Sequence, residues 1–115
     1  FQDSRFIGTV EAIERELRHG PTVYRYRADD GLPGSEGGFF LCAAWLVEAY
    51  LACGRHDDAW KLFKEYTALA GPSGLLPEQY DPRQRRTLGN HPQAYSHLGL
   101  IENAIALDRI NRDEP

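Results

Sequence analysis

The residues best suited to chemistry lie in one stretch, Leu75–Pro82, which carries the carboxylates Glu78 and Asp81. Its two prolines keep this stretch stiff and out of a helix. Its leucines and Tyr80 would anchor it to a core and fix the direction of Glu78. Carboxylates are the usual acid and base in glycosidic-bond cleavage, so Glu78 is the candidate general base. The alternative is a surface turn that carries two solvated acids.

Three further residues are candidates for substrate binding: Glu36, Tyr80 and Gln93. Glu36 lies between glycines where a helix is expected to begin, so it either satisfies the free N–H groups of that helix or contacts substrate hydroxyls. Tyr80 could stack on a sugar ring, although most aromatic residues here are expected in the core. Gln93 begins the last predicted helix and could line a pocket with Tyr95. His97 is expected to be a hydrogen-bonded core residue.

The cysteines and histidines do not predict a metal site or any other cofactor. Cys42 and Cys53 fall within one predicted helix, separated by about 16 Å of helix rise, which is beyond disulfide reach. They indicate small buried residues in a reducing compartment, and therefore a cytoplasmic location. His91 and His97 lie on either side of a loop–helix junction, without the spacing of metal ligands.

The bulk composition is that of a globular domain. The chain has 115 residues, 42% of them apolar and 26% charged, which is enough for one core. A net charge of −4 argues against nucleic acid as a partner. No stretch reaches the roughly 18 apolar residues of a membrane span, and Phe1 begins no signal peptide. The absence of an initial Met predicts that the sequence is a piece of a longer protein.

Four helices are expected to position these residues. Periodicity predicts amphipathic helices over Ser4–His19 and Asp58–Ala70, and helices that are apolar nearly all round over Glu36–Cys53 and Gln93–Ile110. The connections between them are long, short and long. In an up-and-down order both long connections fall at one end, so we expect two layers of helices with the functional loops grouped there.

Five separated segments also resemble a known family: Asp30–Phe39, Cys42–Trp45, Gly54–Ala59, Leu75–Asp81 and Gly89–His97. Together they are similar to the C-terminal part of bacterial glucoamylase-like glycoside hydrolases, a family that includes prokaryotic trehalases. The similarity extends over nearly the whole chain, in the order and spacing of that family.

The resemblance implies an all-α fold of consecutive outer and inner helical hairpins, in which residues 1–115 form about the last third of an (α/α)6 catalytic barrel. It implies an inverting hydrolase of α-linked glucosyl oligosaccharides or trehalose, with Glu78 as the general base. The general acid of the family follows a Trp in an upstream motif. Neither Trp45 nor Trp60 is followed by a Glu, so the acid is expected outside this chain.

The fragment is therefore predicted to be inactive alone, and to need the missing N-terminal part of its barrel. Apolar faces left without that part should make it self-associate. Two alternatives belong to other classes: a helical-repeat interaction module, suggested by Gly54–Phe63, and a helical carbohydrate-binding domain without catalysis. The repeat period of about 34 residues is not kept, because the second half contains a long loop.

Overall fold

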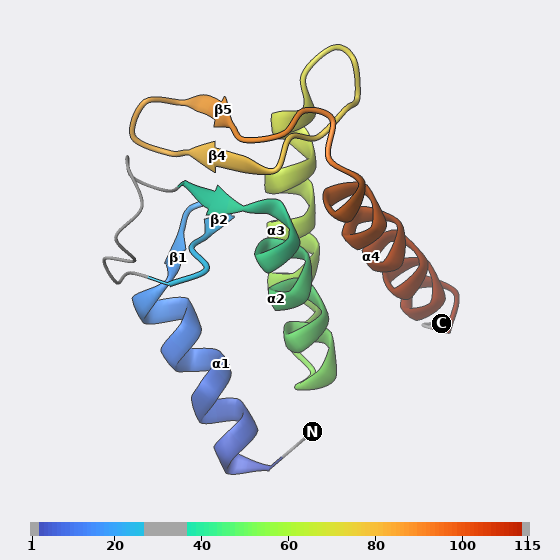
Figure 1. Cartoon of the computed structure of the whole chain (residues 1–115). Helices are drawn as coiled ribbons and strands as arrows, with labels where there is room; N and C mark the ends of the chain where they lie inside the picture. Colours follow the sequence, from blue (N-terminus) through green and yellow to red (C-terminus); the bar gives the residue numbers. More distant parts are fainter. Residues whose placement is uncertain (1–2, 27–36, 114–115) are drawn as a thin grey trace.

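A computed structural model describes residues 3–26 and 37–113 of the chain. Its helices run alternately up and down (Figure 1). They are α1 (Ser4–Glu16), α2 (Phe40–Ala52), α3 (His56–Thr67) and α4 (Ala94–Asp113), and a 3-10 turn, Ala68–Ala70, extends α3. The prediction of an all-α fold is confirmed, although short strands join the helices. In the described ranges no helix has the length and apolar character needed to cross a membrane.

The first helix begins at a side-chain cap, where Asp3 Oδ1 accepts a hydrogen bond from Arg5 N at 2.7 Å. It ends at Glu16, so the predicted extension to His19 is wrong. Residues Arg18–His19 form strand β1, which pairs with strand β2, Thr22–Val23. Gly20 makes this hairpin possible with a φ of +60°, a conformation that favours glycine.

Helices α2 and α3 also begin at positions that differ from the prediction. The residues before α2, Gly38–Phe39, form strand β3 instead of a first helical turn. Helix α3 begins at His56, so Asp57 lies in its first turn, near the positive end of the helix dipole. The short link between the helices uses Gly54 at a φ of +82°, a conformation that favours glycine.

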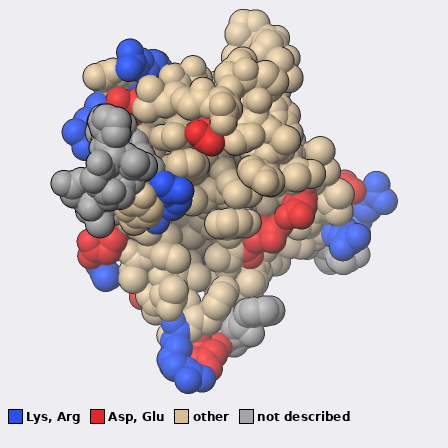
Figure 2. All heavy atoms as spheres, viewed as in Figure 1, with Lys and Arg blue, Asp and Glu red and all other residues tan. Residues whose placement is uncertain are grey.

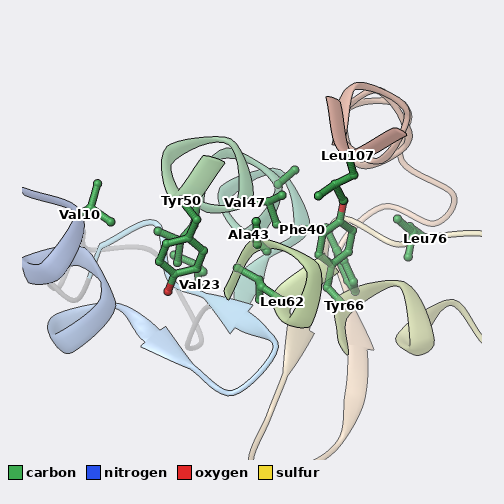
Figure 3. Close-up of a cluster of buried hydrophobic side chains, with 13 residues drawn as sticks. Val10, Val23, Phe40, Ala43, Val47, Tyr50, Leu62, Tyr66, Leu76 and Leu107 are labelled. Atoms are coloured by element: carbon green, nitrogen blue, oxygen red, sulfur yellow. The ribbon is translucent and has the colours of Figure 1, made fainter. Parts of the chain in front are cut away.

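Helix α2 forms the centre of the core, as its apolar sequence predicts. Figure 3 shows side chains from every helix converging on it. At Gly99, α4 comes so close that an added Cβ would lie 2.7 Å from Ala44 Cβ. A buried polar contact joins three helices beside this point: Tyr66 donates to Asn103 Oδ1 at 2.7 Å, and Asn103 Nδ2 donates to Ala44 O at 3.0 Å. Among the described residues, the core cluster consists of Val10, Val23, Phe40, Ala43, Ala44, Leu46, Val47, Tyr50, Ala59, Leu62, Tyr66, Leu76 and Leu107.

Helix α4 is less enclosed than its sequence predicts. One side packs on α2, but a stripe of large apolar side chains faces outward. Its members, which we call the α4 stripe, are Tyr95, Leu98, Ile101 and Ile105, and each is 49–63% exposed. Figure 2 shows few charged atoms over α2 and the first turns of α4, whereas most Lys and Arg atoms lie toward the rim of this face. The apolar composition of α4 is therefore not explained by burial within this chain.

The two long connections meet in one small antiparallel sheet. Strand β3 pairs with β4 (Gln79–Asp81), which in turn pairs with β5 (Arg86–Leu88). The register places Gly38 opposite Tyr80, and Gln79 opposite both Phe39 and Leu88. Figure 1 shows this sheet across the ends where α2 and α4 begin. The prediction that both long connections share one end is confirmed.

Candidate active site at the start of helices α2 and α4

The backbone of Glu78 is fixed where the two long connections meet. Its N–H donates to Asn90 O at 2.8 Å, and its carbonyl accepts from Phe40 N at 3.2 Å. The preceding residues, Leu76 and Pro77, are buried, and β4 begins directly after Glu78. The predicted non-helical loop is thus anchored on both sides, as its flanking apolar residues indicated.

Residues at the start of α4 also form hydrogen bonds to the loop that precedes Glu78. Gln93 N donates to Leu76 O at 3.0 Å, and Ser96 Oγ donates to Pro77 O at 2.7 Å. Leu76 N donates to His97 Nε2 at 3.2 Å, so the ring proton lies on Nδ1, which donates to Gln93 O at 2.7 Å. His97 is a hydrogen-bonded structural residue, as the sequence indicates for a histidine on an apolar helix.

The Glu78 carboxylate accepts a hydrogen bond at each oxygen. Gln79 Nε2 donates to Oε1, and Gln93 Nε2 donates to Oε2, both at 3.1 Å. Gln79 is held in turn by Gly37, whose N–H donates to its Oε1 at 3.0 Å. Both donors are neutral side-chain amides.

Gly89 closes the side of Glu78 that faces β5. A Cβ at this position would meet Glu78 Oε1 and lie 3.0 Å from Glu78 Cβ and 3.2 Å from its Cδ, so the Glu78 side chain would have to shift. The φ of Gly89 is +75°, so the backbone also favours glycine. The side chain of Glu78 is therefore confined between a glycine and two amides.

A pocket of about 190 Å³ opens beside this carboxylate. Two of its walls are aromatic and strongly exposed: Trp45 is 59% and Tyr95 is 63% exposed. Arg25 supplies a positive charge, and its guanidinium lies 4.8 Å from the centroid of the Phe39 ring. Exposed aromatic faces beside a carboxylate and an arginine suit a ligand with apolar faces and hydroxyl edges. The described residues that line it are Arg25, Phe39, Leu41, Cys42, Trp45, Glu78, Gln93, Tyr95 and Ser96.

The four predicted site residues do not all lie in the pocket. Glu78 and Gln93 lie together in the pocket wall. Tyr80 lies in β4, two residues from Glu78, and packs partly buried against the core. Glu36 lies outside the described residues.

Arg25 and Trp45 are two of the pocket residues that were not among the predicted site residues. Trp45 was expected in the core, because it stands in an almost continuously apolar helix. Its exposure depends on the neighbours of α2, which a periodicity cannot show. Arg25 lies in the segment after β2, and the sequence likewise does not predict that this segment passes beside the pocket.

Among the residues that the structure describes, no group of three or more His, Cys, Asp and Glu side chains could hold a metal ion. The histidine of the pocket region, His97, uses both ring nitrogens in hydrogen bonds to the backbone. The chemistry that this site offers is that of a carboxylate and its amides.

Comparison with known proteins identifies relatives of the whole stretch. The family model for glycosyl hydrolases family 15 matches residues 1–105. A trehalase of Mycolicibacterium smegmatis is 40% identical over 114 residues, which cover 96% of this chain and 17% of the relative. A trehalase of Thermoplasma acidophilum is 41% identical over 107 residues, or 92% of this chain and 18% of the relative. Trehalase 1 of Sulfolobus acidocaldarius is 31% identical over 100 residues, or 87% and 18%.

The chain therefore spans less than a fifth of the length of these curated relatives. No solved structure matches it significantly.

Proposed function

The chain belongs to glycosyl hydrolases family 15, and on this basis we propose that it is part of an inverting α-glucoside hydrolase in which Glu78 is the general base. Relatives that are themselves named trehalases make trehalose the first substrate to test, followed by α-linked glucosyl oligosaccharides. The observation that carries the proposal is the Glu78 carboxylate, held by two amides at the wall of a pocket with exposed aromatic faces.

In the proposed reaction, ionised Glu78 accepts a proton from a water molecule as the water oxygen bonds to the anomeric carbon. The bond from that carbon to the glycosidic oxygen breaks at the same time. The leaving oxygen takes a proton from a general acid on the opposite face of the sugar, so an α-glucoside yields β-glucose. An inverting pair stands roughly 6.5–9.5 Å apart, which leaves space for the water. We assign the acid to a part of the parent protein outside this chain.

The amides and hydroxyls near Glu78 would orient the sugar. Gln93 lines the pocket. Its side-chain carbonyl oxygen, and the side-chain N–H that does not bind Glu78, suit a sugar hydroxyl. Tyr80 and Glu36 complete the proposed set of substrate-binding residues. For Tyr80, its place in β4 next to the Glu78 loop supports this role.

The proposed domain is a partial (α/α)6 barrel formed by residues 1–115, with α1 and α3 outside and α2 and α4 inside. Two features support it: the up-and-down order of the helices, and the α4 stripe, which would contact other inner helices of the parent. The fragment alone then lacks the acid and hydrolyses nothing. A cytoplasmic location remains a prediction from the cysteine spacing.

The test is Glu78→Gln in a full-length protein that contains this segment. Loss of the base should lower kcat by about 100-fold or more, since general-base catalysis contributes roughly that much. Asp81→Asn is the matched control. Asp81 Oδ1 accepts from Arg83 N at 2.9 Å and Gln84 N at 3.3 Å, contacts that an Asn oxygen can keep, so activity should stay within a few-fold.

Proton NMR of the first product separates the remaining possibilities. Initial release of β-glucose supports inversion, and release of α-glucose without β-glucose contradicts it. From trehalose, inversion gives one β-glucose and one α-glucose, because the leaving glucose keeps its α configuration. Full turnover in the Glu78→Gln protein would show that another residue is the base. Sugar binding by the wild-type protein without any turnover would favour the non-catalytic binding domain instead.

A further inference from the structure

Gln93 is the contact between the Glu78 carboxylate and helix α4. Its side-chain amide donates to Glu78 Oε2 at 3.1 Å, and the structure gives that oxygen no second protein partner among the described residues. Glu78 Oε1 receives its hydrogen bond from the neighbouring residue, Gln79. The orientation of the carboxylate plane is thus set by one local donor and one donor from the start of a helix.

The backbone of Gln93 is itself fixed by several hydrogen bonds. Its N–H donates to Leu76 O at 3.0 Å, and its carbonyl accepts from His97 Nδ1 at 2.7 Å. These contacts hold the backbone of Gln93 in place without help from its side chain. Replacing the side chain therefore removes the contact to Glu78 and leaves the joint between loop and helix intact.

We propose that Gln93 is a positioning residue, whose amide fixes the orientation of the Glu78 carboxylate for its role as base. This inference rests on the proposed function of Glu78. It goes beyond substrate binding by Gln93, because the amide acts on the carboxylate whether or not a sugar is present.

The choice of an amide has a chemical reason. A glutamate at position 93 would place a second carboxylate about as close to Glu78 as the amide is, and two carboxylates at such a distance share one proton. An arginine or lysine would hold the charge of Glu78 so strongly that its basicity would fall. A neutral donor orients the group and leaves it able to accept a proton. Arg25 is the other charged side chain that lines this pocket.

The first test uses two variants in a full-length protein that contains this segment. Gln93→Leu removes the donor at similar volume, and kcat should fall by about 10- to 100-fold through misorientation, with a smaller change in KM. Gln93→Glu should move the acid limb of the kcat/KM profile upward by one pH unit or more, because the paired carboxylates hold a proton longer. A change in KM alone, with an unmoved acid limb, would overturn the positioning role.

The matched control is Gln84→Glu, the same change at an exposed residue in the turn between β4 and β5. It adds an equal charge to the hairpin that follows Glu78, at a residue that does not line the pocket. Its pH profile should coincide with that of the wild-type protein. A similar shift in this variant would mean that general charge, and not contact with Glu78, causes the effect.

The second test needs no turnover. In the 115-residue chain labelled with ¹³C at the glutamate side chains, the Glu78 signal is assigned by its loss in Glu78→Gln and is followed against pH. Gln93→Glu should move the titration of that signal upward by one unit or more, and Gln84→Glu should leave it in place. An unmoved signal overturns the inference. A moved signal supports the contact even if Glu78→Gln leaves the parent active, so the two proposals can fail separately.

Discussion

The space around the Glu78 side chain is set by a residue that has no side chain. Gly89 faces Glu78 so closely that its missing Cβ defines where the carboxylate can lie. Its φ of +75° is a second, independent requirement for glycine. A substitution here would therefore affect both the backbone and the Glu78 carboxylate, and the two effects can be separated.

We predict that Gly89→Ala lowers the unfolding free energy by about 1–3 kcal/mol, because Ala is strained at positive φ and meets Glu78. It should also reduce activity of the full-length protein by about 10-fold or more, through a displaced carboxylate. Urea unfolding and steady-state kinetics measure the two effects.

Gly74→Ala is the matched control, with a φ of +72° and nothing within 4 Å of the added Cβ. It carries the backbone cost alone, so its activity should remain near wild type. Equal losses of activity in both variants would contradict a specific contact between residue 89 and Glu78.

At the scale of elements, α1 is attached to the other helices by a polar network around Tyr50, whose side chain is fully buried. The Tyr50 hydroxyl donates to Glu14 Oε2 in α1 and accepts from Arg18 at 2.9 Å. Arg55 donates to the same Glu14 oxygen at 2.8 Å, and its guanidinium lies 4.5 Å from the centroid of the Tyr50 ring. Few other polar contacts join α1 to the described core.

The network perturbs two ionisable groups in opposite directions. The hydrogen bond from Tyr50 lowers the pKa of Glu14 against the opposing effect of burial, and Arg55 and Arg18 lower it further. Burial, followed by the hydrogen bond to Glu14, raises the pKa of Tyr50 to about 12. The Glu14 contribution to stability is thus lost as pH falls through its lowered pKa. The Tyr50 contribution is complete below about pH 10 and is lost as pH rises toward about 12.

We predict that Tyr50→Phe lowers the unfolding free energy by about 1–2 kcal/mol near neutral pH, because Glu14 loses a donor while the ring still packs. The difference from wild type should be largest between about pH 5 and 9.5 and shrink on both sides. Urea unfolding at a series of pH values measures it. Tyr24→Phe, which also removes a tyrosine hydroxyl, is the comparison. A difference for Tyr50→Phe that is constant from pH 3 to 12 would contradict the linkage.

At the scale of the whole molecule, the apolar surface is divided unevenly. Half of the apolar side chains of helix α2 are buried, whereas the α4 stripe faces outward. An exposed apolar face of this kind is typical of an interface. In the proposed barrel it contacts helices of the parent protein, and in the isolated chain it is left to solvent or to a second copy.

We predict that the isolated chain self-associates and that Ile101→Glu shifts it toward the monomer, because a charge at the centre of the stripe would have to be buried in the interface. Sedimentation velocity over a range of concentrations measures this. Asn111→Glu is the control, since it adds the same charge to the last turns of α4 outside the stripe. A wild-type chain that is monomeric throughout would argue against a barrel fragment.

Much of this arrangement follows from the sequence alone. Apolar periodicity identifies all four helices, and the alternation of long and short connections places Glu78 and the start of α2 at one end. The prolines around Glu78 exclude a helix there, and the separated motifs indicate the family. These features are local or additive along the chain, so a single sequence is sufficient to show them.

Tertiary structure decided the rest. Arg18–His19 continues the helical pattern of α1, but pairing with Thr22–Val23 takes these residues into a strand. Gly38–Phe39 leaves the predicted helix in the same way, because β4 supplies its hydrogen bonds. Strand pairing joins residues far apart in sequence, and no local propensity contains that information.

The same reason applies to the site. The glutamate could be identified from its loop, but the amides on its two oxygens, the glycine against its side chain and the exposed ring of Trp45 depend on how α2, α4 and the sheet pack together. The sequence by itself determined which residue carries the candidate base. Only the tertiary structure decided what holds it, because contacts between distant segments form when the chain folds.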